Sequence, residues 1–327
     1  MRQGRDRNEA LFGSWLEGVS GAFDPSEPIG FCIYCGERRA ELLTDEHIAP
    51  EALQGTLLLK KASCRTCAGL TGYSELRTLR GPLWVAREHF GFYGNRRSAD
   101  RPSTLPLEIL RTDWTVETLW LPVADFPLVF RMPRFPAPRF LQPPHAEDAD
   151  FLRKYDYRQI DTPQGIERLR SVLAADAARE KPVLDMQVFE LSKVLAKIAY
   201  CFAVYFLGPY SIRPFVTNII IAPRDHAPNF LHYIGGAFSP TGPIEQLTTT
   251  DIGKCVVRIE THDGVQIVLA RVQLLGRLGA PVYEVVVGEL MATADERTIY
   301  VPVPPVPNKT YTELKSESFA LVMSATS

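Results

Sequence analysis

The sequence lacks any apolar run long enough to cross a membrane. The longest, IAYCFAVYFL at residues 198–207, falls well short of the roughly 20 residues that a membrane helix needs. Lys193 and Lys197 lie just before it, so we expect a buried helix. The N-terminal stretch MRQGRDRNEALFGSWLEG also lacks the apolar segment of a secretory signal. These absences predict a cytoplasmic protein with no membrane partner.

The sequence also has almost no net charge. Its 36 Lys and Arg residues nearly balance 38 Asp and Glu residues, which leaves a formal charge of −2. Such a chain has no overall attraction to nucleic acid, so any affinity of this kind must come from a local patch. The 327 residues, 46% hydrophobic and 23% charged, are ordinary for a globular protein of one or two domains.

Cysteines are few, and four of the six fall into two Cys-x-x-Cys pairs separated by 28 residues. In a cytoplasmic chain this spacing favours a metal site over disulfides. Two such turns supply the four thiolates of a tetrahedral zinc site, and Gly36 suits the tight turn after the first pair. We therefore predict a structural Zn²⁺ held by Cys32, Cys35, Cys64 and Cys67.

Between the two pairs lies the stretch LTDEHIAPEAL, which combines a histidine with two carboxylates. A solvated loop is one interpretation of such a stretch. A second interpretation is a hydrolytic site, because an imidazole can take a proton from water while an adjacent carboxylate holds a divalent ion.

The combined pattern CxxCG, TDEHIxPEALxG and ASCxxC resembles the HNH endonuclease family, in its variant with a four-cysteine zinc knuckle. The resemblance covers residues 32–75 and implies a treble-clef (ββα-metal) fold. By position it implies that Glu46 holds a catalytic divalent metal such as Mg²⁺ or Mn²⁺. It likewise implies that His47 is the general base, with Asp45 as an alternative ligand.

Two positions depart from the family pattern. Residues 48–64 contain no Asn to orient the histidine, and Ala68 stands where a final His or Asn is usual. Glu75 lies eight residues after Cys67 on the same face of the expected helix, which makes it a possible substitute ligand. His47 is thus either a catalytic base or a structural remnant on a zinc scaffold.

A basic stretch follows at residues 60–101, with nine basic and three acidic residues. Such a stretch beside a phosphodiester site suits contact with a nucleic-acid backbone, although a solvated helix face explains it too. The candidate contact residues are Lys60, Lys61, Arg65, Arg77, Arg80 and Arg87.

We expect an α+β protein with three parts: a lead-in at 1–27, an HNH zinc-knuckle domain at 28–102, and an α+β domain at 103–327. The last has a long buried helix at 188–208 and an antiparallel sheet, in which His262-Asp263-Gly264 forms a hairpin turn. The residues of this domain indicate no role for it.

The leading hypothesis is a metal-dependent HNH-type endonuclease, with DNA favoured over RNA as its substrate. The main alternative is a treble-clef zinc module that binds nucleic acid without cutting it. A third is a protein-interaction scaffold in which zinc stabilises a small core. The sequence predicts neither the oligomeric state nor the sequence specificity.

Overall fold

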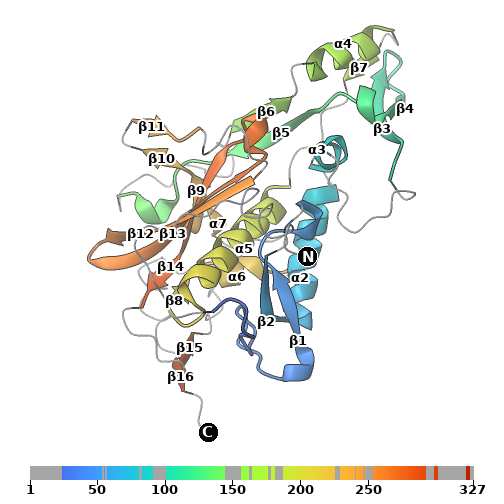
Figure 1. Ribbon diagram of the computed structural model, residues 1–327. Coiled ribbons are helices and arrows are strands. Elements are labelled where there is room, and N and C mark those ends of the chain that lie inside the picture. Colours follow the sequence, from blue (N-terminus) through green and yellow to red (C-terminus); the bar gives the residue numbers. More distant parts are fainter. Residues whose placement is uncertain are drawn as a thin grey trace.

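The structure is a computed structural model of the chain (Figure 1). It describes residues 24–53, 55, 57–80, 83–90, 101–143, 156–161, 164–175, 178–180, 187–224, 229–239, 241–245, 247, 253–291, 298–300 and 322–324.

The cysteine block folds as a β-hairpin followed by two helices. The strands pair antiparallel, and the first helix begins directly after the second strand. These elements are β1 (Leu43–His47), β2 (Leu58–Cys64), α2 (Arg65–Arg80) and α3 (Leu83–His89).

The largest sheet lies in the C-terminal half and is antiparallel throughout. Its strand order is β12-β13-β14-β8, and β9 also pairs with β14. The turn between β12 and β13 has positive φ at both Asp263 (50°) and Gly264 (78°), as a two-residue hairpin turn requires. The predicted hairpin is therefore confirmed. The bounds are β12 Gly253–His262, β13 Val265–Leu274, β14 Val282–Leu290, β8 Ile212–Pro214 and β9 Ile234–Gly236.

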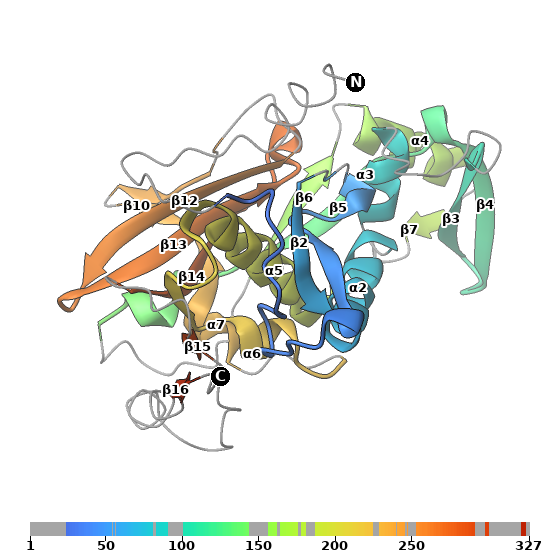
Figure 2. The ribbon, with the colours of Figure 1, turned by 60° about the horizontal axis from the view of Figure 1, so that its bottom comes forward.

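The helix α5 (Val188–Leu207) is the central element of the fold, and it confirms the predicted long buried helix. It ends at Gly208, whose φ of 85° is one that an L side chain rarely adopts. Every residue from Glu190 to Val204 is buried. Figures 1 and 2 show why: α5 lies between the large sheet on one side and the β1–β2 hairpin with α2 on the other.

Smaller elements surround this centre. They are β3 (Thr104–Arg111), β4 (Val116–Pro122), β5 (Val129–Arg134), β6 (Asp156–Asp161), α4 (Gly165–Ala175), β7 (Ala178–Glu180), α6 (Thr217–Ile220), α7 (Phe230–Tyr233), β10 (Phe238–Ser239), β11 (Gly242–Pro243), β15 (Thr298–Tyr300) and β16 (Val322–Ser324). Strands β4, β3 and β7 form a separate sheet, and β5 pairs with β6.

The chain thus has a mixed α+β fold with antiparallel sheets, as predicted from the sequence. One continuous hydrophobic core includes Ile48 and Leu59 of the cysteine block together with Leu195 and Val285 of the C-terminal half. The predicted domain boundaries stay a prediction. Residues 1–23 of the lead-in, and residues 91–100 just before the boundary at 102, lie outside the described residues.

None of the helices in the described ranges combines the length and the apolar character that a membrane span requires.

Gly288 of β14 provides a test of the sheet. A Cβ atom at this position would lie 2.2 Å from the carbonyl oxygen of Arg213 in β8. We expect Gly288→Ala to lower the free energy of unfolding by about 1–3 kcal/mol, because the two strands must separate to relieve the overlap. Urea unfolding measures the loss.

The matched control is Gly72→Ala in α2, where a Cβ atom would meet nothing within 4 Å. This change should be neutral or should stabilise the protein by up to about 1 kcal/mol, since alanine favours a helix. Equal stability of the two variants would contradict the described pairing of β8 with β14.

Candidate metal centre and adjoining acidic site

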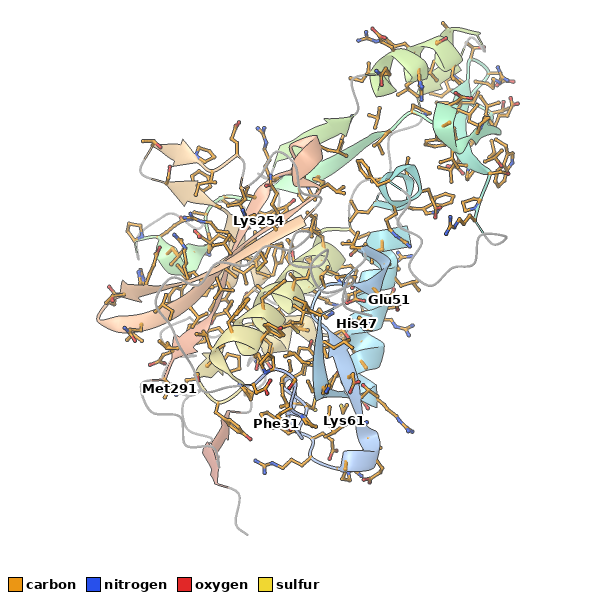
Figure 3. The ribbon with its side chains drawn as sticks, in the orientation of Figure 1. Phe31, His47, Glu51, Lys61, Lys254 and Met291 are labelled. Atoms are coloured by element: carbon orange, nitrogen blue, oxygen red, sulfur yellow. The ribbon has the colours of Figure 1, made fainter. Side chains whose placement is uncertain are left out.

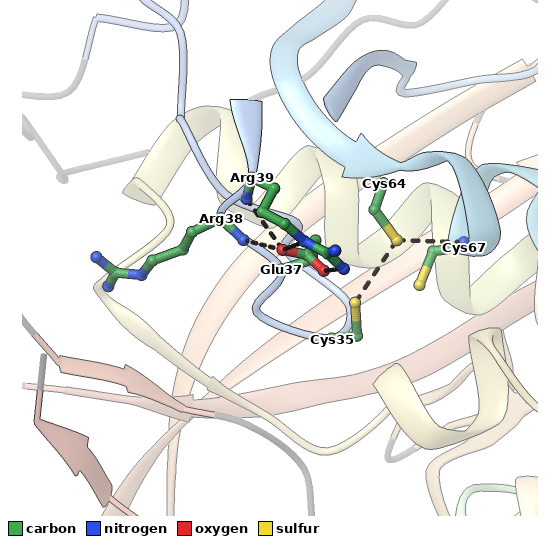
Figure 4. A network of polar contacts seen from close by, with 6 residues as sticks. All are labelled: Cys35, Glu37, Arg38, Arg39, Cys64 and Cys67. Atoms are coloured by element: carbon green, nitrogen blue, oxygen red, sulfur yellow. Dashed lines mark hydrogen bonds and ion pairs between the residues drawn. The ribbon is translucent and has the colours of Figure 1, made fainter. Parts of the chain in front are cut away.

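The four paired cysteines meet at one point. Their sulfur atoms all lie within 4.8 Å of one another. Figure 4 shows three of them, with Cys35 Sγ 3.7 Å from Cys64 Sγ. Four ligands at about 2.3 Å from one zinc ion have sulfurs about 3.8 Å apart. The geometry of the predicted four-cysteine site is confirmed: these residues are close enough to hold a metal ion.

Local backbone geometry explains how the first pair is shaped. The Gly36 amide donates a hydrogen bond to the Cys32 carbonyl (2.8 Å), and the Cys32 amide donates to the Glu37 carbonyl (2.7 Å). Gly36 has a φ of 77°, so glycine is the residue that this turn favours. The second pair straddles the junction of β2 and α2, where the Cys67 amide points at Cys64 Sγ at 3.5 Å.

The crowding of the thiols also affects their protonation. Hydrogen bonds from Cys32 and Cys67 lower the pKa of Cys35 to about 4. Hydrogen bonding with Cys32 and Cys35 raises the pKa of Cys67. Several thiolates packed this closely repel one another, and a bound cation such as Zn²⁺ relieves that repulsion.

The β1–β2 hairpin has a bulge at Asp45 and Glu46, and these two neighbouring carboxylates lie in different environments. The strand register shifts between Thr44 and Glu46. Asp45 is exposed, and its Oδ1 accepts a hydrogen bond from the Lys61 amide (3.0 Å). Glu46 is buried. Asp45 therefore takes no part in the cluster that Glu46 joins.

Glu46 and Glu75 converge on the same nitrogen atom, which belongs to Lys197 of α5. The ammonium lies 3.1 Å from Glu46 Oε1 and 2.7 Å from Glu75 Oε1. It also donates a hydrogen bond to the backbone carbonyl of His47. The Lys197 side chain is 2% exposed. Thus the two acidic side chains predicted to hold a catalytic metal do come together, but around a lysine.

The surroundings of Lys197 favour its charged form. Burial alone lowers the pKa of Lys197, but the carboxylates of Glu75 and Glu46 outweigh this effect and raise the pKa above its usual range. Two carboxylate side chains and one ammonium give the cluster a formal charge of −1. With the ammonium in place, these residues as folded do not fit the divalent ion that the sequence predicts.

His47 ends β1 beside α2, at the end of the hairpin away from Lys61 (Figure 3). Its side chain is partly exposed. No hydrogen bond joins its imidazole to any other described residue, which agrees with the lack of an orienting Asn in the sequence. The imidazole is therefore free to meet an incoming group, while its own backbone carbonyl belongs to the Lys197 cluster.

Two further contacts join α5 to the first cysteine turn. The Tyr200 hydroxyl donates to the Ile33 carbonyl (3.0 Å), and the Tyr34 hydroxyl lies 3.2 Å from Cys201 Sγ. Tyr200 and Cys201 follow Lys197 by about one helical turn, so all three side chains share one face of α5. This face holds both the cysteine turn and the acidic pair.

The predicted nucleic-acid contacts differ in exposure. Four of the six are exposed: Lys60, Lys61, Arg65 and Arg77. Arg87 is buried, and its guanidinium donates to the carbonyls of Ala52 (3.0 Å) and Leu79 (3.3 Å), so its role is structural. Lys61 Nζ donates to the Leu43 carbonyl (3.2 Å). The side chain of Arg80 lies outside the described residues.

Sequence reasoning missed Lys197 as a site residue. The available signal was its place in an otherwise apolar helix, since a buried lysine needs an acidic partner. Nothing in the sequence showed that the partners lie more than 120 residues earlier.

Comparisons of this chain with protein-family models, with curated proteins and with solved structures find no match. The candidate site therefore rests on its own geometry.

The cysteine cluster generates a direct test. Purified protein should contain about one zinc ion per chain, measured by plasma mass spectrometry, and Cys64→Ser should lose it because one of four ligands is gone. The same variant should melt at a lower temperature, since metal binding stabilises the folded state.

Cys255→Ala is the matched control. Cys255 is a buried cysteine outside the cluster. This variant should keep its zinc. Full zinc content in Cys64→Ser, or none in the unchanged protein, would show that the cluster is not the metal site.

Proposed function

We propose that this chain acts on nucleic acid through an HNH-type treble-clef module, and that its activity is phosphodiester cleavage with His47 as the general base. DNA is the favoured substrate. The observation that supports this proposal is the convergence of Glu46, Glu75 and the His47 backbone carbonyl, in a β-hairpin and following helix that also carry two of the four clustered cysteines.

In this proposal, zinc at the four cysteines stabilises the hairpin and the start of α2. The partly exposed His47 imidazole is available to accept a proton from an attacking water molecule. The family pattern places Glu46 at the metal, and Glu75 is the substitute ligand that its spacing after Cys67 suggests. Of the three side chains, only the His47 imidazole makes no hydrogen bond or ion pair within the described region.

Lys197 favours a second candidate function, a zinc module that binds nucleic acid without cutting it. The lysine ammonium uses both carboxylates and the His47 carbonyl. The cluster as a whole carries negative charge, which repels a phosphate group instead of stabilising it. If the ammonium stays in place, the scaffold of a nuclease is present but hydrolysis is not supported.

Both candidates share nucleic acid as a partner, and the exposed basic residues near the module support this. Lys60 lies on β2, and Arg65 and Arg77 lie on α2. Contacts of such side chains with phosphates supply most of the sequence-independent affinity for nucleic acid.

Cleavage distinguishes the two candidates. Purified protein supplied with Mg²⁺ or Mn²⁺ should nick supercoiled plasmid, and His47→Ala should lower the rate by about 10²–10⁴-fold, the usual contribution of a general base. Conversion of supercoiled to relaxed plasmid on agarose gels measures the rate, with single-stranded RNA as a second substrate.

The His47→Ala protein must retain zinc and the melting temperature of the unchanged protein, since His47 is not one of the four cysteine ligands. If the unchanged protein nicks neither substrate above the level of His47→Ala, the non-cutting candidate is the correct one.

Binding is tested separately from cleavage. Replacing Lys60 and Arg65 with alanine should weaken DNA binding and reduce the dependence of log K on log salt by about one unit for each lost phosphate contact. Fluorescence anisotropy at several salt concentrations measures both quantities. The charge-matched control is Arg131→Ala with Arg134→Ala, two exposed arginines on β5. Equal effects of the two double variants would contradict a specific basic surface on the module.

A further inference from the structure

The Glu46–Lys197–Glu75 cluster has the composition of a cation site, but its cation is part of the protein. The three oxygen atoms around Lys197 Nζ come from the carboxylates of Glu46 and Glu75 and from the His47 carbonyl. They belong to β1 and α2, whereas the lysine belongs to α5. Three segments distant in the sequence therefore close one charge cluster.

The Lys197 ammonium is held on three sides in this arrangement. It donates hydrogen bonds to Glu75 Oε1 and to the His47 carbonyl, and it forms an ion pair with Glu46 Oε1. These three partners equal in number the three N–H donors of an ammonium group. Lys197 therefore interacts with the two carboxylates, where a metal ion would otherwise lie.

A divalent ion at this point would need the same oxygens, at about 2.0–2.6 Å. The ammonium already lies 2.7 Å from one carboxylate and 3.1 Å from the other, so the two cations would occupy overlapping positions and repel each other. Moving Lys197 aside is costly, because α5 is buried around it and an ammonium inside the protein that loses its carboxylate partners is left unpaired.

We propose that Lys197 is the resident cation of this centre and that, in the protein without nucleic acid, it excludes a divalent ion from Glu46 and Glu75. The proposal rests on the proposed function in treating this centre as the cation position of an HNH-type module. It assigns to α5, in the C-terminal half, control over whether that position can accept a metal.

Lys193, a second buried lysine on α5, provides the comparison for Lys197. Lys193 lies one turn earlier and is equally buried, with its Nζ 3.2 Å from Glu190 Oε1 and 2.7 Å from the Pro223 carbonyl. The carboxylate that forms an ion pair with Lys193 comes from the same helix. Removal of this amine leaves no pair of carboxylates, so Lys193 serves as a matched control.

The experiment uses full-length, zinc-loaded protein and Mn²⁺ alone as the probe. Loss of the free Mn²⁺ signal in electron paramagnetic resonance gives the affinity, and thermal unfolding with and without Mn²⁺ gives the stability. The variants are Lys197→Met, Lys193→Met, and Lys197→Met combined with Glu46→Gln. Zinc content is measured in each to show that Mn²⁺ has not replaced it.

We expect Lys197→Met to bind one Mn²⁺ ion at least about tenfold more tightly than the unchanged protein, a change equivalent to ~1.4 kcal/mol. Its melting temperature should rise on addition of Mn²⁺. Lys193→Met and the double variant should bind Mn²⁺ no better than the unchanged protein. A structural role of Lys197 alone would lower stability without this gain in Mn²⁺ affinity.

Equal Mn²⁺ affinity of folded Lys197→Met and the unchanged protein would overturn the proposal. If Lys197→Met does not fold even with Mn²⁺, the proposal is tested by Mn²⁺ binding to the unchanged protein. Mn²⁺ binding to it that is lost in Glu46→Gln would show that the lysine does not exclude the ion, whereas no such binding supports the proposal. None of these readouts uses cleavage, so they stand whether or not the chain proves to be an endonuclease.

Discussion

The buried ammonium of Lys197 is the interaction on which the organisation of this protein depends. It lies inside the protein, where a charge is tolerated only when it is paired and hydrogen-bonded. Its partners come from a strand and a helix of the cysteine block, so the charge is satisfied only when that block packs on α5. Removing one member of such a buried pair typically costs about 3–5 kcal/mol, because the other charge is left unpaired.

The same interaction joins the two halves of the chain. Glu46 of β1 and Glu75 of α2 both contact one face of α5 through Lys197. Tyr200 and Cys201 on that face contact the first cysteine turn directly. The cysteine cluster and the acidic cluster are therefore adjacent parts of one structure, and Lys197 of the C-terminal half completes the acidic cluster.

Cation identity then determines what the site can do. A divalent ion between two carboxylates neutralises them and can stabilise charge on a phosphate. An ammonium group between the same carboxylates offers a phosphate no such stabilisation. The proposed HNH-type activity needs a divalent ion where the proposed resident cation lies. If the proposed function is correct, the competition between these two cations decides between cutting and binding alone.

The sequence by itself determined the local parts. The two Cys-x-x-Cys pairs, the glycine after the first pair, the long helix that stops at Gly208 and the Asp263-Gly264 turn were all predictable, because each depends on residues close together in the chain. It also identified Glu46 and Glu75 as residues that could share a cation. Only the tertiary structure decided which cation they hold, since Lys197 reaches them from a helix more than 120 residues away. It likewise separated exposed Lys60 and Arg65 from buried Arg87, because burial of a long basic side chain depends on the elements packed around it and not on its neighbours in sequence.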